Sequence, residues 1–265
     1  MTSTPLPARA RPFLRPFLLL STLGLLGVAA IVPTLGPLIA RIRSLPDAPP
    51  MPEAALVAVL LVQPALLVLA TVALGVATAE RAGFASWLLR RSRGEPAAFE
   101  ARRLPSTLGL AALLAALVAA LDLVLRARFP ASFGALPRLD AVPLSARLAG
   151  PLYGGITEEL MMRFGIMSAL VALGARLLRR RPAALVWAAI LLAAGLFGAA
   201  HLPAILQTGA SDGVILARTI GLNAVLGTLY GWLYATRNLE HAMLAHAATH
   251  GVFWLATPLL APLIG

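Results

Sequence analysis

Seven long apolar stretches dominate the sequence and restrict the folds that it can adopt. Each is at least about 20 residues long, the length of helix that crosses the hydrocarbon core of a bilayer with its backbone fully hydrogen-bonded. The sequence therefore predicts an all-α fold, a polytopic bundle of about seven transmembrane helices. The predicted spans are residues 15–38, 54–79, 105–125, 145–175, 183–206, 213–236 and 239–262. The proline-rich stretch 129–147 could hold an eighth, half-buried segment.

Composition and charge exclude several classes of protein. Hydrophobic residues make up 59% of the 265-residue chain, charged residues only 12%, and the mean hydropathy is +0.85, which excludes a water-soluble globule. All basic residues are arginines in short clusters between apolar runs, a placement typical of membrane orientation signals, so we expect no nucleic-acid partner. The lack of cysteine excludes disulfides and a cysteine nucleophile.

The arginine distribution predicts the orientation of the helices. Arg9, Arg11 and Arg15 precede the first span, and placing them in the cytoplasm puts most of the loop arginines on that side, with the C-terminus outside. The alternative is a signal peptide cleaved near Ala30. Because the apolar run continues to Leu38, longer than a usual signal-peptide core, we favour an uncleaved anchor.

Ionisable residues divide the chain into two parts, residues 1–140 with about three spans and residues 141–265 with about four. In the first part the spans contain only Asp122, close to a span end and expected at the membrane interface. His241, at the start of the last span, is also expected there. Ionisable groups at bilayer depth are costly and usually functional. The last four spans include Glu158, Glu159, Arg163, His201, His246 and His250.

The densest polar cluster lies in the fourth span. Glu159 and Arg163 are four residues apart and can pair on one helix face. Glu158 is rotated away from that pair and has no cation on its own helix, which suits a general base. The alternative is that the Glu159–Arg163 pair only ties helices together.

Three histidines lie in the fifth and the last span. His201 lies in the last helical turn before Pro203, four residues after Phe197. His246 and His250 share a face of the last span, a spacing that suits a metal ion or the stabilisation of one oxygen. Alternatively, these two imidazoles could form a proton relay, and His201 could be a packing residue.

Together and in this order, the three motifs resemble those of the CAAX protease and bacteriocin-processing family of intramembrane proteases, also called CPBP or Abi. The family motifs EExxxR, FxxxH and HxxxN stand here as Glu158-Glu159-x-x-x-Arg163, Phe197-x-x-x-His201 and His246-x-x-x-His250. The resemblance covers about residues 145–255. His250 departs from the family asparagine, although an imidazole can also donate a hydrogen bond.

The resemblance implies an intramembrane endopeptidase of the CAAX-protease type, acting on membrane-associated or lipid-modified peptides or proteins. It implies that Glu158 activates the attacking water and that His201 orients this water. Glu159 with Arg163 would brace the helix. The expected partners are the bilayer and a peptide substrate, and the alanine-rich, lysine-free composition is typical of GC-rich bacteria. We therefore expect a multi-pass protein of a bacterial plasma membrane.

The resemblance further implies that His246 and His250 stabilise the oxyanion of the tetrahedral intermediate. The family is also described as metalloproteases, and the set that could hold Zn²⁺ is Glu159, His201 and His246. The residues alone are equally consistent with glutamate and histidine activating water without a metal.

Helix geometry sets a condition on this site. At 1.5 Å per residue, His201 lies roughly 25–30 Å from the arginines at 179–181, whereas His246 lies about 10 Å from that side. Straight, parallel spans would keep the two histidines apart. The site therefore requires a helix that begins outside the bilayer, strong tilt, or another topology.

Two functions of other classes remain as alternatives. One is a transporter or proton-coupled channel, in which the same residues form a relay. The sequence has no convincing internal repeat and its polar residues crowd into one half, which argues against the usual transporter construction. The other is a non-catalytic membrane scaffold.

Overall fold

The computed structural model describes residues 12–48, 50–134, 136–141 and 143–264, and throughout these the only regular structure is helical. Seven helical stretches are long and apolar enough to cross a membrane, which confirms the predicted fold class. Arg9 and Arg11 lie outside the described residues. The spans are Leu14–Thr34, Glu53–Thr78, Ala101–Arg128, Gly150–Leu178, Ala183–Gln207, Gly213–Thr236 and Leu239–Ile264.

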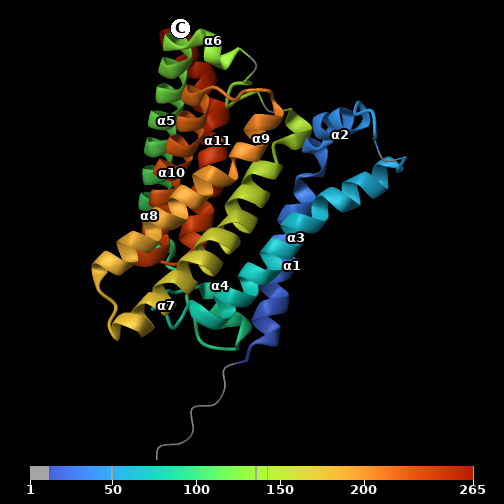
Figure 1. The fold of residues 1–265 in the computed structure, drawn as a ribbon. Coiled ribbons are helices and arrows are strands. Elements are labelled where there is room, and N and C mark those ends of the chain that lie inside the picture. Colours follow the sequence, from blue (N-terminus) through green and yellow to red (C-terminus); the bar gives the residue numbers. More distant parts are fainter. Residues whose placement is uncertain (1–11, 49, 135, 142, 265) are drawn as a thin grey trace, which may run out of the picture.

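These spans consist of long helices and shorter helical turns (Figure 1). The long helices are α1 (Leu14–Ala30), α3 (Glu53–Thr78), α5 (Leu104–Arg128), α7 (Ser168–Leu178), α8 (Ala183–Ala200), α10 (Gly213–Thr236) and α11 (Leu239–Ile264). The short helices are α2 (Gly36–Arg43), α4 (Trp87–Ser92), α6 (Pro130–Phe133) and α9 (Leu202–Gln207). The 3-10 turns are η1 (Val32–Thr34), η2 (Ala101–Arg103) and η3 (Leu144–Ala146), and two π-helical segments, η4 (Gly150–Glu158) and η5 (Leu160–Met167), lead into α7.

The first span differs from its prediction. A single run over residues 15–38 was expected, but α1 ends at Ala30 and α2 turns away from it (Figure 1). Pro33 and Pro37 cause the break, because each lacks the backbone N–H that an uninterrupted helix needs. In the described part of residues 129–147, only α6 and η3 are helical, so the eighth segment does not form a span.

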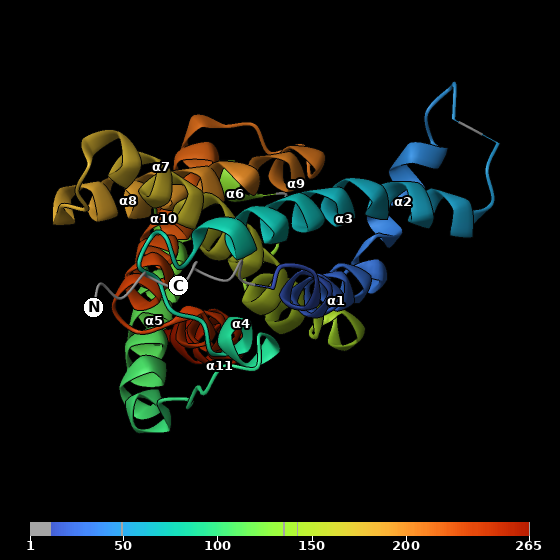
Figure 2. The same ribbon diagram turned by 90° about the horizontal axis from the view of Figure 1, so that it is seen from below.

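The π-helical segment is surrounded by the other spans. We call the end of the bundle where α1 begins the N-terminal end, and the end where α11 finishes the C-terminal end. In the view along the bundle, α1 and α3 lie on one side, α5 and α11 on another, and α7, α8 and α10 on a third (Figure 2). Glycines permit close contacts: a Cβ on Gly165 would lie 2.6 Å from the Thr71 Cβ.

One hydrophobic core connects the two predicted parts of the chain. It contains Leu20 and Val72 from the first part together with Phe164 and Leu233 from the second. Thr157 adds a polar link, because its hydroxyl donates to the Gly24 carbonyl at 2.7 Å. Residues 1–140 and 141–265 thus share one hydrophobic core. Their division into two domains stays a prediction.

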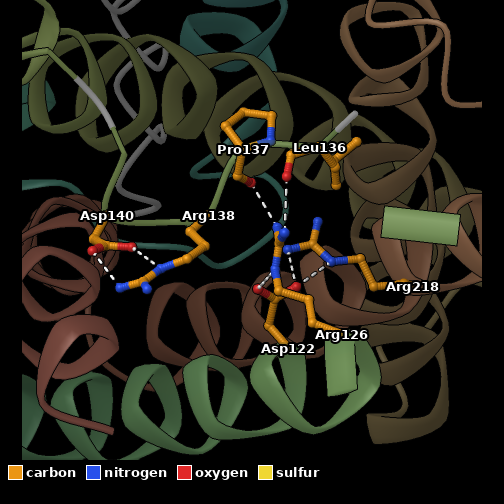
Figure 3. A network of polar contacts seen from close by, with 7 residues as sticks. All are labelled: Asp122, Arg126, Leu136, Pro137, Arg138, Asp140 and Arg218. Carbon is orange, nitrogen blue, oxygen red and sulfur yellow. Dashed lines mark hydrogen bonds and ion pairs between the residues drawn. The ribbon is translucent and has the colours of Figure 1, made fainter. Parts of the chain in front are cut away.

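Asp122, which the sequence predicts at the membrane interface, lies near the end of α5 and is fully buried (Figure 3). Its carboxylate accepts hydrogen bonds from Arg126 Nε at 3.0 Å and from Arg218 Nε at 2.7 Å. Arg126 also donates to the carbonyls of Leu136 and Pro137, at 2.8 and 2.6 Å. This network joins α5, α10 and the loop after α6 at the C-terminal end. The two arginines compensate the negative charge of the buried carboxylate.

His241, in the first turn of α11, is likewise buried, and its predicted position at the membrane interface stays a prediction. Its Nδ1 lies 2.7 Å from the Asn238 side-chain oxygen, and its ring stacks on Phe99 with centroids 5.1 Å apart. The loop between α4 and α5 thus covers the start of α11.

Candidate active site

Four of the predicted residues line one cavity of about 210 Å³ within the bundle. Glu158 comes from η4, His201 from the end of α8, and His246 and His250 from α11. Glu159 and Arg163, the other two predicted residues, are fully buried and do not line it. The remaining lining residues are Ile31, Ala149, Gly150, Tyr153, Gly154, Phe197, Asn223, Leu226, Tyr230, Thr249 and Phe253.

A tilted helix removes the conflict in depth between His201 and His246. Helix α8 crosses the bundle obliquely, whereas α5 and α11 run along its length (Figure 1). Phe197 of α8 lies between the two histidines, its ring centroid 4.8 Å from that of His201 and 5.6 Å from that of His246. Of the three explanations that the sequence left open, strong tilt is the one that the structure contains.

Glu159 joins the fourth span to the last one. Its Oε1 accepts a hydrogen bond from Arg163 at 3.0 Å, as the spacing predicted, and lies 2.8 Å from His246 Nδ1. An ionised carboxylate only accepts, so His246 Nδ1 carries the proton. The Nε2 atom of His246 then points toward Glu158, whose Oε2 is 3.8 Å away. Glu159 therefore fixes both the ring orientation and the tautomer of His246.

Arg163 holds three helices around this carboxylate. It is fully buried, donates to the Gly227 carbonyl of α10 at 2.9 Å, and lies over the rings of Phe197 and Tyr230 at 4.8 and 5.3 Å. Such cation–π contacts stabilise a desolvated guanidinium. Arg163 thus stabilises the wall behind the cavity.

His201 has a similarly defined tautomer. Its Nδ1 lies 2.8 Å from the Phe197 carbonyl oxygen, which can only accept, so the proton is on Nδ1 and Nε2 is left as an acceptor in the neutral ring. The ring caps the end of α8, where Pro203 lies in the first turn of α9. The predicted helix end at this histidine is confirmed.

His250 is held differently, without a hydrogen bond to its ring. It stacks on His246 with centroids 5.4 Å apart, and its Nε2 is buried with no hydrogen-bond partner among the described residues. Two glycines of η4 make room for it. A Cβ on Gly154 would lie 2.7 Å from His250 Nε2 and 3.0 Å from His246 Nε2, and one on Gly150 would lie 2.7 Å from His250 Nδ1.

Sequence reasoning missed several residues of this site. Gly150 and Gly154 form a GxxxG pair shortly before the glutamates, and this pattern could have predicted a close contact there. Tyr230 stacks on His246 with centroids 4.4 Å apart and donates to Thr249 at 2.8 Å, and nothing in its span marks it. Asn223 donates to the Thr219 carbonyl at 2.8 Å and is the single carboxamide of its span, a signal that was available.

The predicted zinc set does not fit this arrangement. Within the described residues, no group of three His, Asp or Glu side chains could hold a metal ion. Glu159 already shares one oxygen between Arg163 and His246. Zinc sites need three or four converging ligands. Zinc dependence of the protein stays a prediction.

Fold and cavity together define a class, the polytopic membrane proteins with a Glu–His cluster buried among their helices. Residues 140–252 match the family model described as Rce1-like, type II CAAX prenyl endopeptidase. The match covers less than half of the chain but contains all three motifs, which confirms the resemblance. This part of the chain is therefore similar to the CAAX-type intramembrane endopeptidases. No curated protein and no solved structure matches the chain.

Proposed function

We propose that the chain hydrolyses peptide bonds of membrane-associated or lipid-modified peptides, with Glu158 as the general base. The observation that carries the proposal is the single cavity in which Glu158, His201, His246 and His250 meet. Its walls are largely apolar, and charges developing in such a site are stabilised strongly by fixed polar groups. The family match supports the reaction class, and the residue roles rest on the geometry.

A water molecule between Glu158 and His201 would donate one hydrogen bond to each of them. Glu158 offers a carboxylate, and neutral His201 offers the lone pair of Nε2. As the water oxygen bonds to the substrate carbonyl carbon, Glu158 takes its proton and the carbonyl becomes an oxyanion. Collapse of this intermediate breaks the C–N bond, and the proton passes to the departing nitrogen.

The imidazole tautomers separate the roles of the last two histidines. His250 can place a proton on its unpartnered Nε2 and donate to the oxyanion. His246 has its proton on Nδ1 toward Glu159, so it can donate into the cavity only after gaining a second one. Glu158, 3.8 Å away, can share the abstracted proton with it. Of the two predicted oxyanion donors, His250 can therefore donate at once, and His246 can donate only when it is protonated on both nitrogens.

The test uses the full chain in detergent and a library of quenched peptides, half of them carrying a lipid anchor. We expect wild type to cleave at least one peptide and Glu158→Gln to cleave it about 100- to 10,000-fold more slowly, since the amide keeps the shape but cannot take a proton. A zinc chelator is added in a second arm. Activity that survives chelation supports the metal-free mechanism, whereas loss that zinc restores would contradict it.

A proton or solute flux assay in proteoliposomes separates the alternative function. The proposal predicts no flux above empty vesicles. Flux that disappears in Glu158→Gln, without any cleavage, would favour a transporter.

A further inference from the structure

A groove on the lipid-facing surface between α3 and α7 is independent of the catalytic cavity. It has a volume of about 650 Å³. Leu74, Ala169 and Leu173 contribute apolar walls, and Arg81 and Arg176 stand at its N-terminal end. It lies where α3 and α7 both finish, near the bottom of Figure 1.

Small side chains of α7 hollow this groove. Ala169, Ala172 and Ala175 follow at three-residue spacing on α7 and all line it. On its other side, α7 approaches α8 so closely that a Cβ on Gly174 would collide with Leu185. Helix α7 therefore approaches α8 closely at Gly174, whereas its three alanines leave the space of the groove.

The two arginines of the groove are free to bind an anion. Arg81 and Arg176 come from different segments, both are exposed, and neither pairs with an acidic side chain of the described residues. Nearby arginines do have such partners: Arg93 pairs with Glu80 at 2.5 Å and Arg90 with Glu95 at 3.4 Å. Guanidinium groups bind phosphate through paired hydrogen bonds.

A second groove between α1 and α4 repeats this construction at the same end. It has a volume of about 430 Å³, with Leu18 and Leu19 as apolar wall and Arg15 and Arg91 at its head. These two arginines are also exposed and have no acidic partner among the described residues. Each groove also contains a threonine, Thr78 or Thr22, bonded to the carbonyl four residues earlier.

We propose that each groove binds one anionic phospholipid, its phosphate between the two arginines and an acyl chain along the apolar wall. The apolar walls at membrane depth favour a lipid over a free phosphate ion. The two unpaired positive charges favour an anionic over a zwitterionic headgroup, whose own cation they would repel. Basic pockets between transmembrane helices bind anionic lipids in this way.

The test is native mass spectrometry of the full chain with equal amounts of phosphatidylglycerol and phosphatidylcholine. Wild type should retain two phosphatidylglycerol molecules in preference to phosphatidylcholine, and Arg81→Gln/Arg176→Gln should retain one, with at least about tenfold weaker binding at the altered groove. Adding Arg15→Gln/Arg91→Gln should remove the second lipid. Inorganic phosphate should not displace either.

The matched control is Arg179→Gln/Arg180→Gln, which removes the same charge at the same end but lies outside both grooves. It should retain lipids like wild type. An equal loss in this control, or equal retention of the two lipids by wild type, would overturn the proposal. Equal melting temperatures of all variants in phosphatidylcholine alone show that they fold.

Discussion

At the scale of single residues, the site depends on two glycines as much as on its charged and polar side chains. Gly150 and Gly154 leave the space into which the rings of His250 and His246 fit, and the two rings stack there. Glu159 then fixes the tautomer of His246. The charged residues could be singled out from the sequence as a group, because buried charges are conspicuous in apolar spans. The sequence could not predict the fit, because glycines are common in spans.

Gly154→Ala should therefore impair catalysis without unfolding the protein. The added methyl group needs space held by the two imidazoles, so both must shift, and a shift of about 1 Å can cost on the order of 100-fold in rate. The measurement is kcat on the best library peptide. Gly195→Ala is the control, since a Cβ there meets nothing within 4 Å. Equal activity of the two variants would contradict the proposed fit.

At the scale of elements, sequence length and hydropathy sufficed to locate the spans but not to shape them. The ends of α3 and α10 lie close to their predictions, because nothing but helix satisfies the backbone in hydrocarbon. The break after α1 and the π-helical start of the fourth span were not predicted. The tilt of α8 depends on packing between distant segments, which periodicity does not reveal.

Packing at the C-terminal end also sets the position of His201. Helix α9 follows this histidine, and its Ile205 packs against a small core of Phe133, Leu136, Ala210 and Ile215. In the Asp122 network, Arg126 donates hydrogen bonds to the loop after α6 that contains Leu136 (Figure 3). A buried ion network thus supports one wall of the cavity from a distance.

Asp122→Asn should destabilise the protein by about 3 kcal/mol, because it leaves two largely buried guanidinium groups without their counter-charge. The measurement is the free energy of unfolding by denaturant in detergent. Asp140→Asn is the control: its pair with Arg138 is more exposed and should contribute less than about 1 kcal/mol. A loss no greater in Asp122→Asn than in Asp140→Asn would show that the network is dispensable.

At the scale of the whole molecule, the cavity lies toward the C-terminal end of the bundle. Ile31 follows α1, Gly150 begins the fourth span and His201 ends α8, and all three line the cavity from that end. The arginine distribution predicts this end to be outside the cytoplasm. Substrate would then enter from that side.

Single cysteines can test this orientation, because the chain contains none of its own. In intact cells, a membrane-impermeant maleimide should label Ser211→Cys in the exposed loop before α10, and should not label Ala98→Cys between α4 and α5. Both should react after the membrane is permeabilised. The reverse pattern would place the cavity on the cytoplasmic side.

The central claim is that Glu158 is the general base, and kcat of Glu158→Gln tests it most directly. The account predicts a loss of about 100- to 10,000-fold with an unchanged melting temperature, because only proton transfer is removed. Glu53→Gln, at an exposed carboxylate in the first turn of α3, should keep wild-type kcat. A Glu158→Gln variant as active as Glu53→Gln would contradict the account.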